Sequence, residues 1–140
     1  MKNNVTPSEK AHTTGRWAEI IFRALSSRVA KRWKFVSFRG AGSGEWRGVV
    51  DLVAIRKDTK QPHVPGLKRG DLFELVLIQV KGGSAKAPTQ EDIQRLRQVA
   101  THYGAKAVVL FTWKKGTAAE FAVLEEDGTW TPSSGAKVFG

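Results

Sequence analysis

The sequence has no cysteine among its 140 residues, which excludes disulfide bonds, thiolate metal sites and cysteine nucleophiles together. Its three histidines, His12, His63 and His102, lack the spacing of a metal-binding set. No apolar run is long enough to span a bilayer, and the first residues lack the apolar core of a signal peptide. We therefore expect a cytoplasmic protein with no membrane partner, and association with the nucleoid fits the same expectation.

Acidic residues are also scarce. Thirteen Asp and Glu stand against 23 Lys and Arg, which gives a formal net charge of +10 and an isoelectric point near 10.2. Such an excess favours a polyanionic partner, of which nucleic acid is the commonest. An anionic membrane surface is disfavoured, because no segment combines a basic face with a wide apolar face. DNA is therefore the expected partner, with RNA as the alternative.

The pattern of apolar residues predicts one domain over residues 15–140, preceded by a flexible polar segment over residues 1–14. Helical spacing of apolar residues predicts a helix over residues 15–31. A second helix is expected after Thr89 and Asp92, which form a capping-box pattern. Strands are expected over residues 33–38, 48–55, 72–81, 106–113 and 119–124. The order helix, three strands, helix, two strands indicates an α/β fold with a mixed central β-sheet flanked by helices.

Two polar groups lie in the most apolar segments of the chain. Asp51 lies between Val50 and Leu52, and Lys81 follows Gln79 at the end of the second segment. An ionised group buried there without a partner costs several kcal/mol, so it must be paired, hydrogen-bonded or bound to a metal. A buried salt bridge of Asp51 remains an alternative, as does a Lys81 side chain that simply reaches solvent.

Strand alternation and pairing bring these groups together. Residues two apart share a face of a strand, so Gln79 and Lys81 project together while Glu74 points to the opposite face. If the two segments pair as neighbours, Asp51 comes near both. A carboxylate and an amide oxygen are ligands that Mg²⁺ accepts, and a lysine beside them can orient a nucleophile. The constellation predicts metal-assisted hydrolysis of a phosphodiester bond.

The chain resembles the PD-(D/E)XK nuclease superfamily in the order of three features: Asp51, the run Gln79-Val80-Lys81 and the helix that follows it. The stretch Gly15-Arg-Trp-Ala-Glu19 is similar to the first helix of its Holliday-junction-resolvase-like branch, and the likeness runs from Gly15 to about Val109. It implies a restriction-endonuclease-like core and a metal-dependent endonuclease. The expected substrate is DNA, including branched or structured DNA, and the expected cofactor is Mg²⁺ or Mn²⁺. A homodimer is also compatible with the resemblance.

The same resemblance implies roles for individual residues. Asp51 would be the central metal-binding carboxylate, Lys81 the catalytic lysine, and Val80 a ligand through its backbone carbonyl. Glu19 would be a further ligand, although an exposed ion-pair row on the first helix also explains it. Gln79 replaces the usual Glu, and its amide oxygen would still coordinate a hard cation. A neutral ligand binds more weakly, so a nuclease-like module that binds nucleic acid without hydrolysis is the alternative function.

Basic and small residues flank the two central strands, in segments suited to phosphate contacts. The expected nucleic-acid-binding set is Arg39, Ser43, Arg47, Lys57, Lys68, Arg69 and Lys86. Trp46, in the glycine-rich loop, is the one tryptophan considered as a base-stacking platform.

Overall fold

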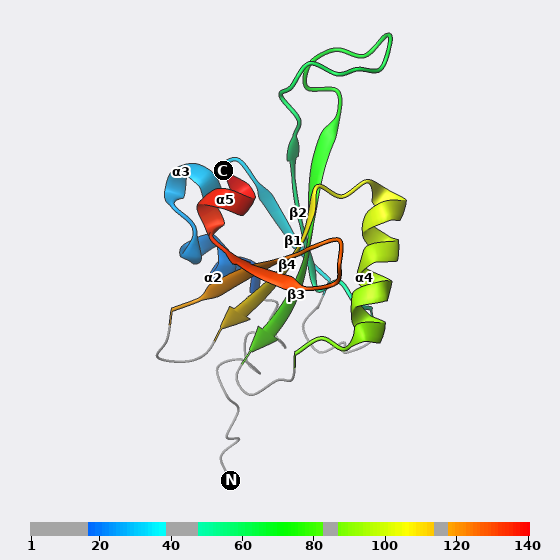
Figure 1. Ribbon diagram of the computed structural model, residues 1–140. Coiled ribbons are helices and arrows are strands. Elements are labelled where there is room, and N and C mark those ends of the chain that lie inside the picture. Colours follow the sequence, from blue (N-terminus) through cyan, green and yellow to red (C-terminus); the bar gives the residue numbers. More distant parts are fainter. Residues whose placement is uncertain (1–16, 39–47, 83–86, 114–117) are drawn as a thin grey trace.

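A computed structural model of the protein describes residues 17–38, 48–82, 87–113 and 118–140 (Figure 1). The expected flexible segment over residues 1–14 lies outside this part of the chain. The described elements are, in chain order, α2 (Trp17–Ala24), α3 (Ser27–Ala30), β1 (Lys34–Ser37), β2 (Leu52–Lys57), β3 (Phe73–Gly82), α4 (Gln90–Tyr103), β4 (Ala107–Trp113), β5 (Glu120–Leu124), β6 (Trp130–Ser133) and α5 (Gly135–Phe139).

The strands form a mixed six-stranded sheet in sequence order, β1-β2-β3-β4-β5-β6. All neighbouring strands are antiparallel except β3 and β4, which are parallel and joined by α4. A parallel connection needs such a crossover, because the chain must return to the starting edge of the sheet. Helices α2, α3 and α5 lie on one side of the sheet and α4 on the other (Figure 1). The predicted α/β class with a mixed, helix-flanked sheet is confirmed.

Side chains of β3 alternate between two apolar layers, as the sequence predicts. Val76 and Ile78 belong to the larger core, which includes Trp17 and Ile21 of α2 and Phe139 of α5. Leu77 belongs to the smaller core under α4, together with Val49, Leu96 and Val108. Since side chains two apart share a face, Gln79 and Lys81 follow Leu77 toward the α4 side.

The first helix is shorter than expected. The sequence predicts one helix over residues 15–31, whereas α2 ends at Ala24 and α3 begins at Ser27. Ser26 has an extended backbone and its side chain accepts a hydrogen bond from Val29 N, so it caps α3 instead of continuing α2. The apolar spacing continues across this break, which is why the periodicity alone did not reveal it.

Local signals predicted α4 and the last turn correctly. Thr89 and Asp92 form the reciprocal capping box, and Gly104 ends the helix in the left-handed conformation with φ of 62°. In the β5–β6 turn, Thr129 donates from both its backbone N–H and its hydroxyl to Asp127 Oδ1. These bonds stabilise the ionised form and lower the pKa of the Asp127 carboxyl below its ordinary value. The sequence analysis did not predict α5.

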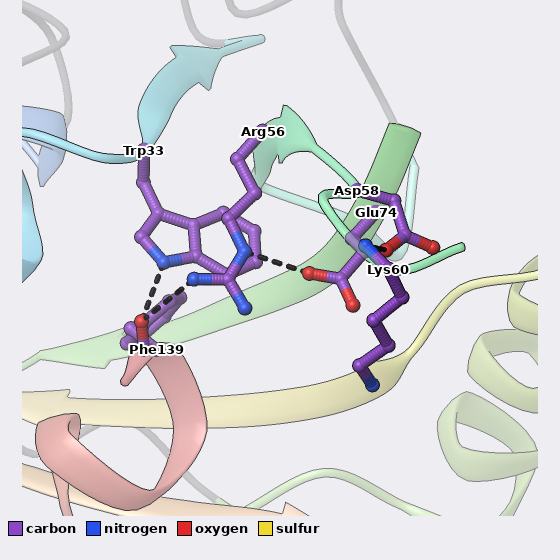
Figure 2. Close-up of polar contacts among 6 residues, drawn as sticks. All are labelled: Trp33, Arg56, Asp58, Lys60, Glu74 and Phe139. Carbon is purple, nitrogen blue, oxygen red and sulfur yellow. Dashed lines mark hydrogen bonds and ion pairs between the residues drawn. The ribbon is translucent and has the colours of Figure 1, made fainter. Parts of the chain in front are cut away.

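Helix α5 is held against the sheet by a network around Arg56 (Figure 2). The Phe139 carbonyl accepts from Trp33 Nε1 at 2.6 Å and from the Arg56 guanidinium at 3.5 Å. Arg56 Nε also donates to Glu74 Oε2 at 2.7 Å, and its guanidinium carbon lies 4.4 Å from the Trp33 ring centroid. The network explains the polar Glu74 on an otherwise apolar face of β3.

Replacing Arg56 by Ala should lower the free energy of unfolding by about 2–3 kcal/mol, because it leaves the carboxylate of Glu74 largely buried without its partner. Urea denaturation followed by circular dichroism measures the change. The matched control is Arg95→Ala, which removes an exposed pair with Asp92 at 3.9 Å and should change stability by less than about 0.5 kcal/mol. Equal effects of the two variants would contradict the role assigned to the network.

Candidate metal and phosphodiester site

The chain enters β2 through an irregular residue. The sequence analysis placed Asp51 within a strand over residues 48–55, but β2 begins at Leu52. Asp51 N donates to Ile78 O at 2.9 Å, and Ile78 is also the register partner of Leu52. Two successive residues therefore oppose one residue of β3, which is the arrangement of a β-bulge. A bulge re-aims the side chain that it carries.

The Asp51 carboxylate binds the backbone of β3. Its Oδ2 atom accepts a hydrogen bond from Val80 N at 2.7 Å, and the side chain is 7% exposed. Val80 connects Gln79 to Lys81, so the carboxylate lies at the peptide backbone between these two residues. The carbonyl of a strand residue points to the same side as its N–H, which directs the Val80 carbonyl toward the edge where Asp51 lies.

Gln79 is buried with an unsatisfied oxygen. The residue is 6% exposed, and its Oε1 atom has no hydrogen-bond partner among the described residues. A buried acceptor without a partner costs about 1–3 kcal/mol, so it is retained only where something compensates for it. Lys81, two residues further on, is half-buried and pairs with Thr112 of β4. The end of β3 thus collects a carboxylate, a free amide oxygen and a lysine.

Glu19 is not part of this collection. It is exposed on α2, while Trp17 and Ile21 of the same helix are buried against the sheet. At 100° per residue, Glu19 points almost opposite to that buried stripe. Within the described residues, no three His, Asp or Glu side chains lie together as a metal-binding group. Glu19 therefore lies on the face of α2 opposite the buried stripe.

Three residues of the expected basic set lie away from the site. Lys57 ends β2, and Lys68 and Arg69 lie in the hairpin loop that projects beyond the sheet (Figure 1). Five residue steps along β2 separate Leu52 from Lys57, a distance of about 17 Å at 3.3–3.4 Å per residue. These three cations thus lie at the far end from Asp51. Arg39, Ser43, Arg47, Lys86 and Trp46 lie outside the described residues.

The sequence analysis overlooked a denser run of cations near the amino-terminal helices. Residues 17–38 carry a single acid, Glu19, against five basic residues, all exposed: Arg23, Arg28, Lys31, Arg32 and Lys34. The signal was their density, since all five lie within twelve consecutive positions. Arg23 lies on α2, Arg28 on α3 and Lys34 at the start of β1, so the fold spreads these cations over neighbouring elements.

These observations define the protein as an α/β domain with a mixed sheet and a polar site at the end of its central strand. No protein-family model matches the chain, and no curated protein matches it in sequence. Among solved structures, the chain is similar to Hjc, a Holliday junction resolvase from the archaeal hyperthermophile Archaeoglobus fulgidus. The alignment covers 90% of this chain and 91% of that one, with 16% identity and a TM-score of 0.46. A likeness at this level assigns no site residue.

No described helix is long and apolar enough to cross a membrane.

The bond between Asp51 and Val80 predicts different stabilities for two variants. Asp51→Asn keeps an acceptor oxygen for Val80 N and should unfold at a urea concentration close to that of the wild type. Asp51→Ala leaves that partly buried N–H without its acceptor and should cost about 1–3 kcal/mol. Urea denaturation of both variants measures the difference. If Asn proved as destabilising as Ala, the hydrogen bond would not be what holds this residue.

Proposed function

We propose that this protein is a divalent-metal-dependent nuclease that hydrolyses phosphodiester bonds of DNA, including structured or branched DNA. The observation that carries the proposal is the Asp51 carboxylate bound to the backbone between Gln79 and Lys81, beside a buried and unsatisfied Gln79 oxygen. The formal net charge of +10 supports a polyanionic substrate. RNA remains the alternative substrate of the same chemistry.

The residues at the end of β3 fit a hard divalent cation. Asp51 offers a carboxylate, Gln79 an amide oxygen and Val80 a backbone carbonyl, and Mg²⁺ and Mn²⁺ prefer such oxygen ligands. A bound cation would supply positive charge against the phosphoryl oxygens and acidify water. It would also give Gln79 Oε1 the partner that it lacks. Glu19 points away from the sheet on α2, so we leave it out of the ligand set.

The protein's own groups have separate tasks in this proposal. Asp51 holds negative charge at a fixed point, because its bond to Val80 N restrains the carboxylate. Lys81 places an ammonium on the same strand, where it orients the attacking water or stabilises charge developing on the phosphate. With one carboxylate and two neutral donors, the site has less negative charge than a site with two acids. We therefore expect strong cation binding only when a substrate phosphate adds its own charge.

A second function is favoured by two specific observations. Gln79 is neutral where a second acid would strengthen metal binding, and no three His, Asp or Glu side chains among the described residues lie together as a metal-binding group. A nuclease-like domain that binds nucleic acid without hydrolysis would retain the basic surface and need no such acids. Salt-sensitive binding together with a complete lack of cleavage would select this function.

Asp51→Asn should lower the rate of DNA cleavage by at least about 100-fold, because it removes the negative charge and keeps the shape of the side chain. The assay incubates labelled single-stranded, duplex and four-way DNA with Mg²⁺ or Mn²⁺. Asp71→Asn, which neutralises an exposed carboxylate in the hairpin loop, is the matched control and should cleave at the wild-type rate. A wild type that cuts none of these substrates, or an active Asp51→Asn variant, would refute hydrolysis at this site.

Gln79→Glu should tighten Mn²⁺ binding to the free protein by about tenfold or more, because a second carboxylate joins Asp51 with almost no change of volume. Isothermal titration calorimetry of wild type and variant measures this without any nucleic acid. Gln94→Glu makes the same exchange at an exposed position on α4 and should leave Mn²⁺ binding unchanged. No gain in affinity for Gln79→Glu would show that this oxygen does not face the cation.

A further inference from the structure

A groove lies between α2, α3 and the start of β1, on the side of the sheet opposite α4. Its volume is about 660 Å³, and its lining includes Glu19, Phe22, Arg23, Lys31, Lys34 and Phe35. None of these residues belongs to the site at the end of β3. The groove is therefore separate from that site.

The floor of the groove is fixed by the packing beneath it. Ala30 and Trp33 line it and are 0% and 3% exposed. Trp33 is held by the hydrogen bond from its Nε1 to the Phe139 carbonyl and by the Arg56 guanidinium over its ring (Figure 2). A floor held from below costs little further ordering when a ligand binds, so the groove is preorganised.

The walls of the groove carry a net positive charge. Arg23, Lys31 and Lys34 are exposed around it, against the single carboxylate of Glu19. Arg28 and Arg32 extend the same positive surface along and just beyond α3. Spaced cations of this kind match a ligand with a repeating negative charge, which a phosphate backbone provides.

Phe22 adds an exposed aromatic ring to the groove, and a phosphate group does not need such a ring. Its side chain is 46% exposed beside Arg23 at the groove, although a large apolar ring gains by being covered. Exposed aromatic rings beside cations are the usual platforms for unpaired bases, whereas paired bases are already stacked within a duplex. We infer that this groove binds a single-stranded segment of nucleic acid, with phosphates on Lys31 and Lys34 and one base stacked on Phe22.

Strand β1 connects the groove to the site at the end of β3. Lys34 begins the strand at the groove, and the Phe38 N–H at its other end bonds to the Asp51 carbonyl at 3.1 Å. Four residue steps separate Lys34 from Phe38, about 13 Å. A strand bound in the groove can thus continue along this edge toward Asp51. The inference rests on the proposed function for the class of partner, but it does not require hydrolysis.

Fluorescence anisotropy with labelled oligothymidylate tests the groove, with EDTA present so that nothing is cleaved. The double variant Lys31→Ala/Lys34→Ala should bind about tenfold more weakly, and its plot of log affinity against log salt should flatten by about 1.4, because two phosphate contacts are lost. Phe22→Ala should also weaken binding about tenfold, with the salt slope unchanged, and Phe22→Tyr should restore it. Thermal denaturation verifies that each variant is folded.

Two controls match these changes elsewhere on the surface. Lys60→Ala/Arg95→Ala removes two exposed cations, one in the hairpin loop and one on α4, and Tyr103→Ala removes a ring that is 61% exposed on α4. Both should bind like the wild type. The inference is overturned if either control weakens binding as much as its groove counterpart, or if the groove variants bind normally. It is also overturned if Phe22→Ala has no effect and a hairpin duplex binds as tightly as the single strand.

The outcome separates the groove from the proposed hydrolysis. A wild type that binds through the groove but cleaves nothing with Mg²⁺ or Mn²⁺ would remove hydrolysis and support the groove. A wild type that cleaves DNA while the groove variants keep full affinity would support hydrolysis and overturn the inference about the groove.

Glu19→Gln is a further test of the groove. Removing the single acid among its lining residues should tighten oligothymidylate binding about twofold or more. Weaker binding by that variant would contradict the inference.

Discussion

The hydrogen bond from Val80 N to the Asp51 carboxylate is the contact on which the candidate site depends. The contact lies just before β2 begins at Leu52. There the N–H of Val80 in β3 bonds to the Asp51 side chain and not to a backbone carbonyl of β2. The bulge at Asp51 is what turns the carboxylate to this position. A regular strand would place this residue in the ladder, with its side chain above or below the sheet.

Polar groups are distributed unequally between the two faces and ends of the sheet. At the far end of β2, Arg56 and Glu74 satisfy each other and hold α5 in place. At the near end, Gln79 keeps an oxygen without a partner in the part of the chain that the structure describes. Stability alone explains the first pair, because both members gain a contact. It does not explain the second, because a buried acceptor without a partner calls for an explanation such as strain, a functional role, a water or an ion.

Much of the fold was predictable because its signals are local. The capping box at Thr89 fixed the start of α4, Asp127 and Gly128 marked the last turn, and alternation assigned the faces of β3. Predictions failed where a local signal was weak or a distant contact decided. The break at Ser26 interrupts no apolar period, and α5 owes its position to Trp33 and Arg56, more than eighty residues away. The distant placement of Lys68 and Arg69 follows from the length of the hairpin, not from their neighbours in sequence.

The sequence by itself determined which chemical groups are available: an acid before one apolar strand, an amide and a lysine at the end of the next, and an excess of positive charge. These follow from composition and from a period of two residues, which act over short distances. Only the tertiary structure decided which groups meet. Strand register and the bulge bring Asp51 to the backbone beside Gln79, while the orientation of α2 turns Glu19 outward. Such pairings depend on how the whole chain buries its apolar surface, and no short stretch of sequence contains that information.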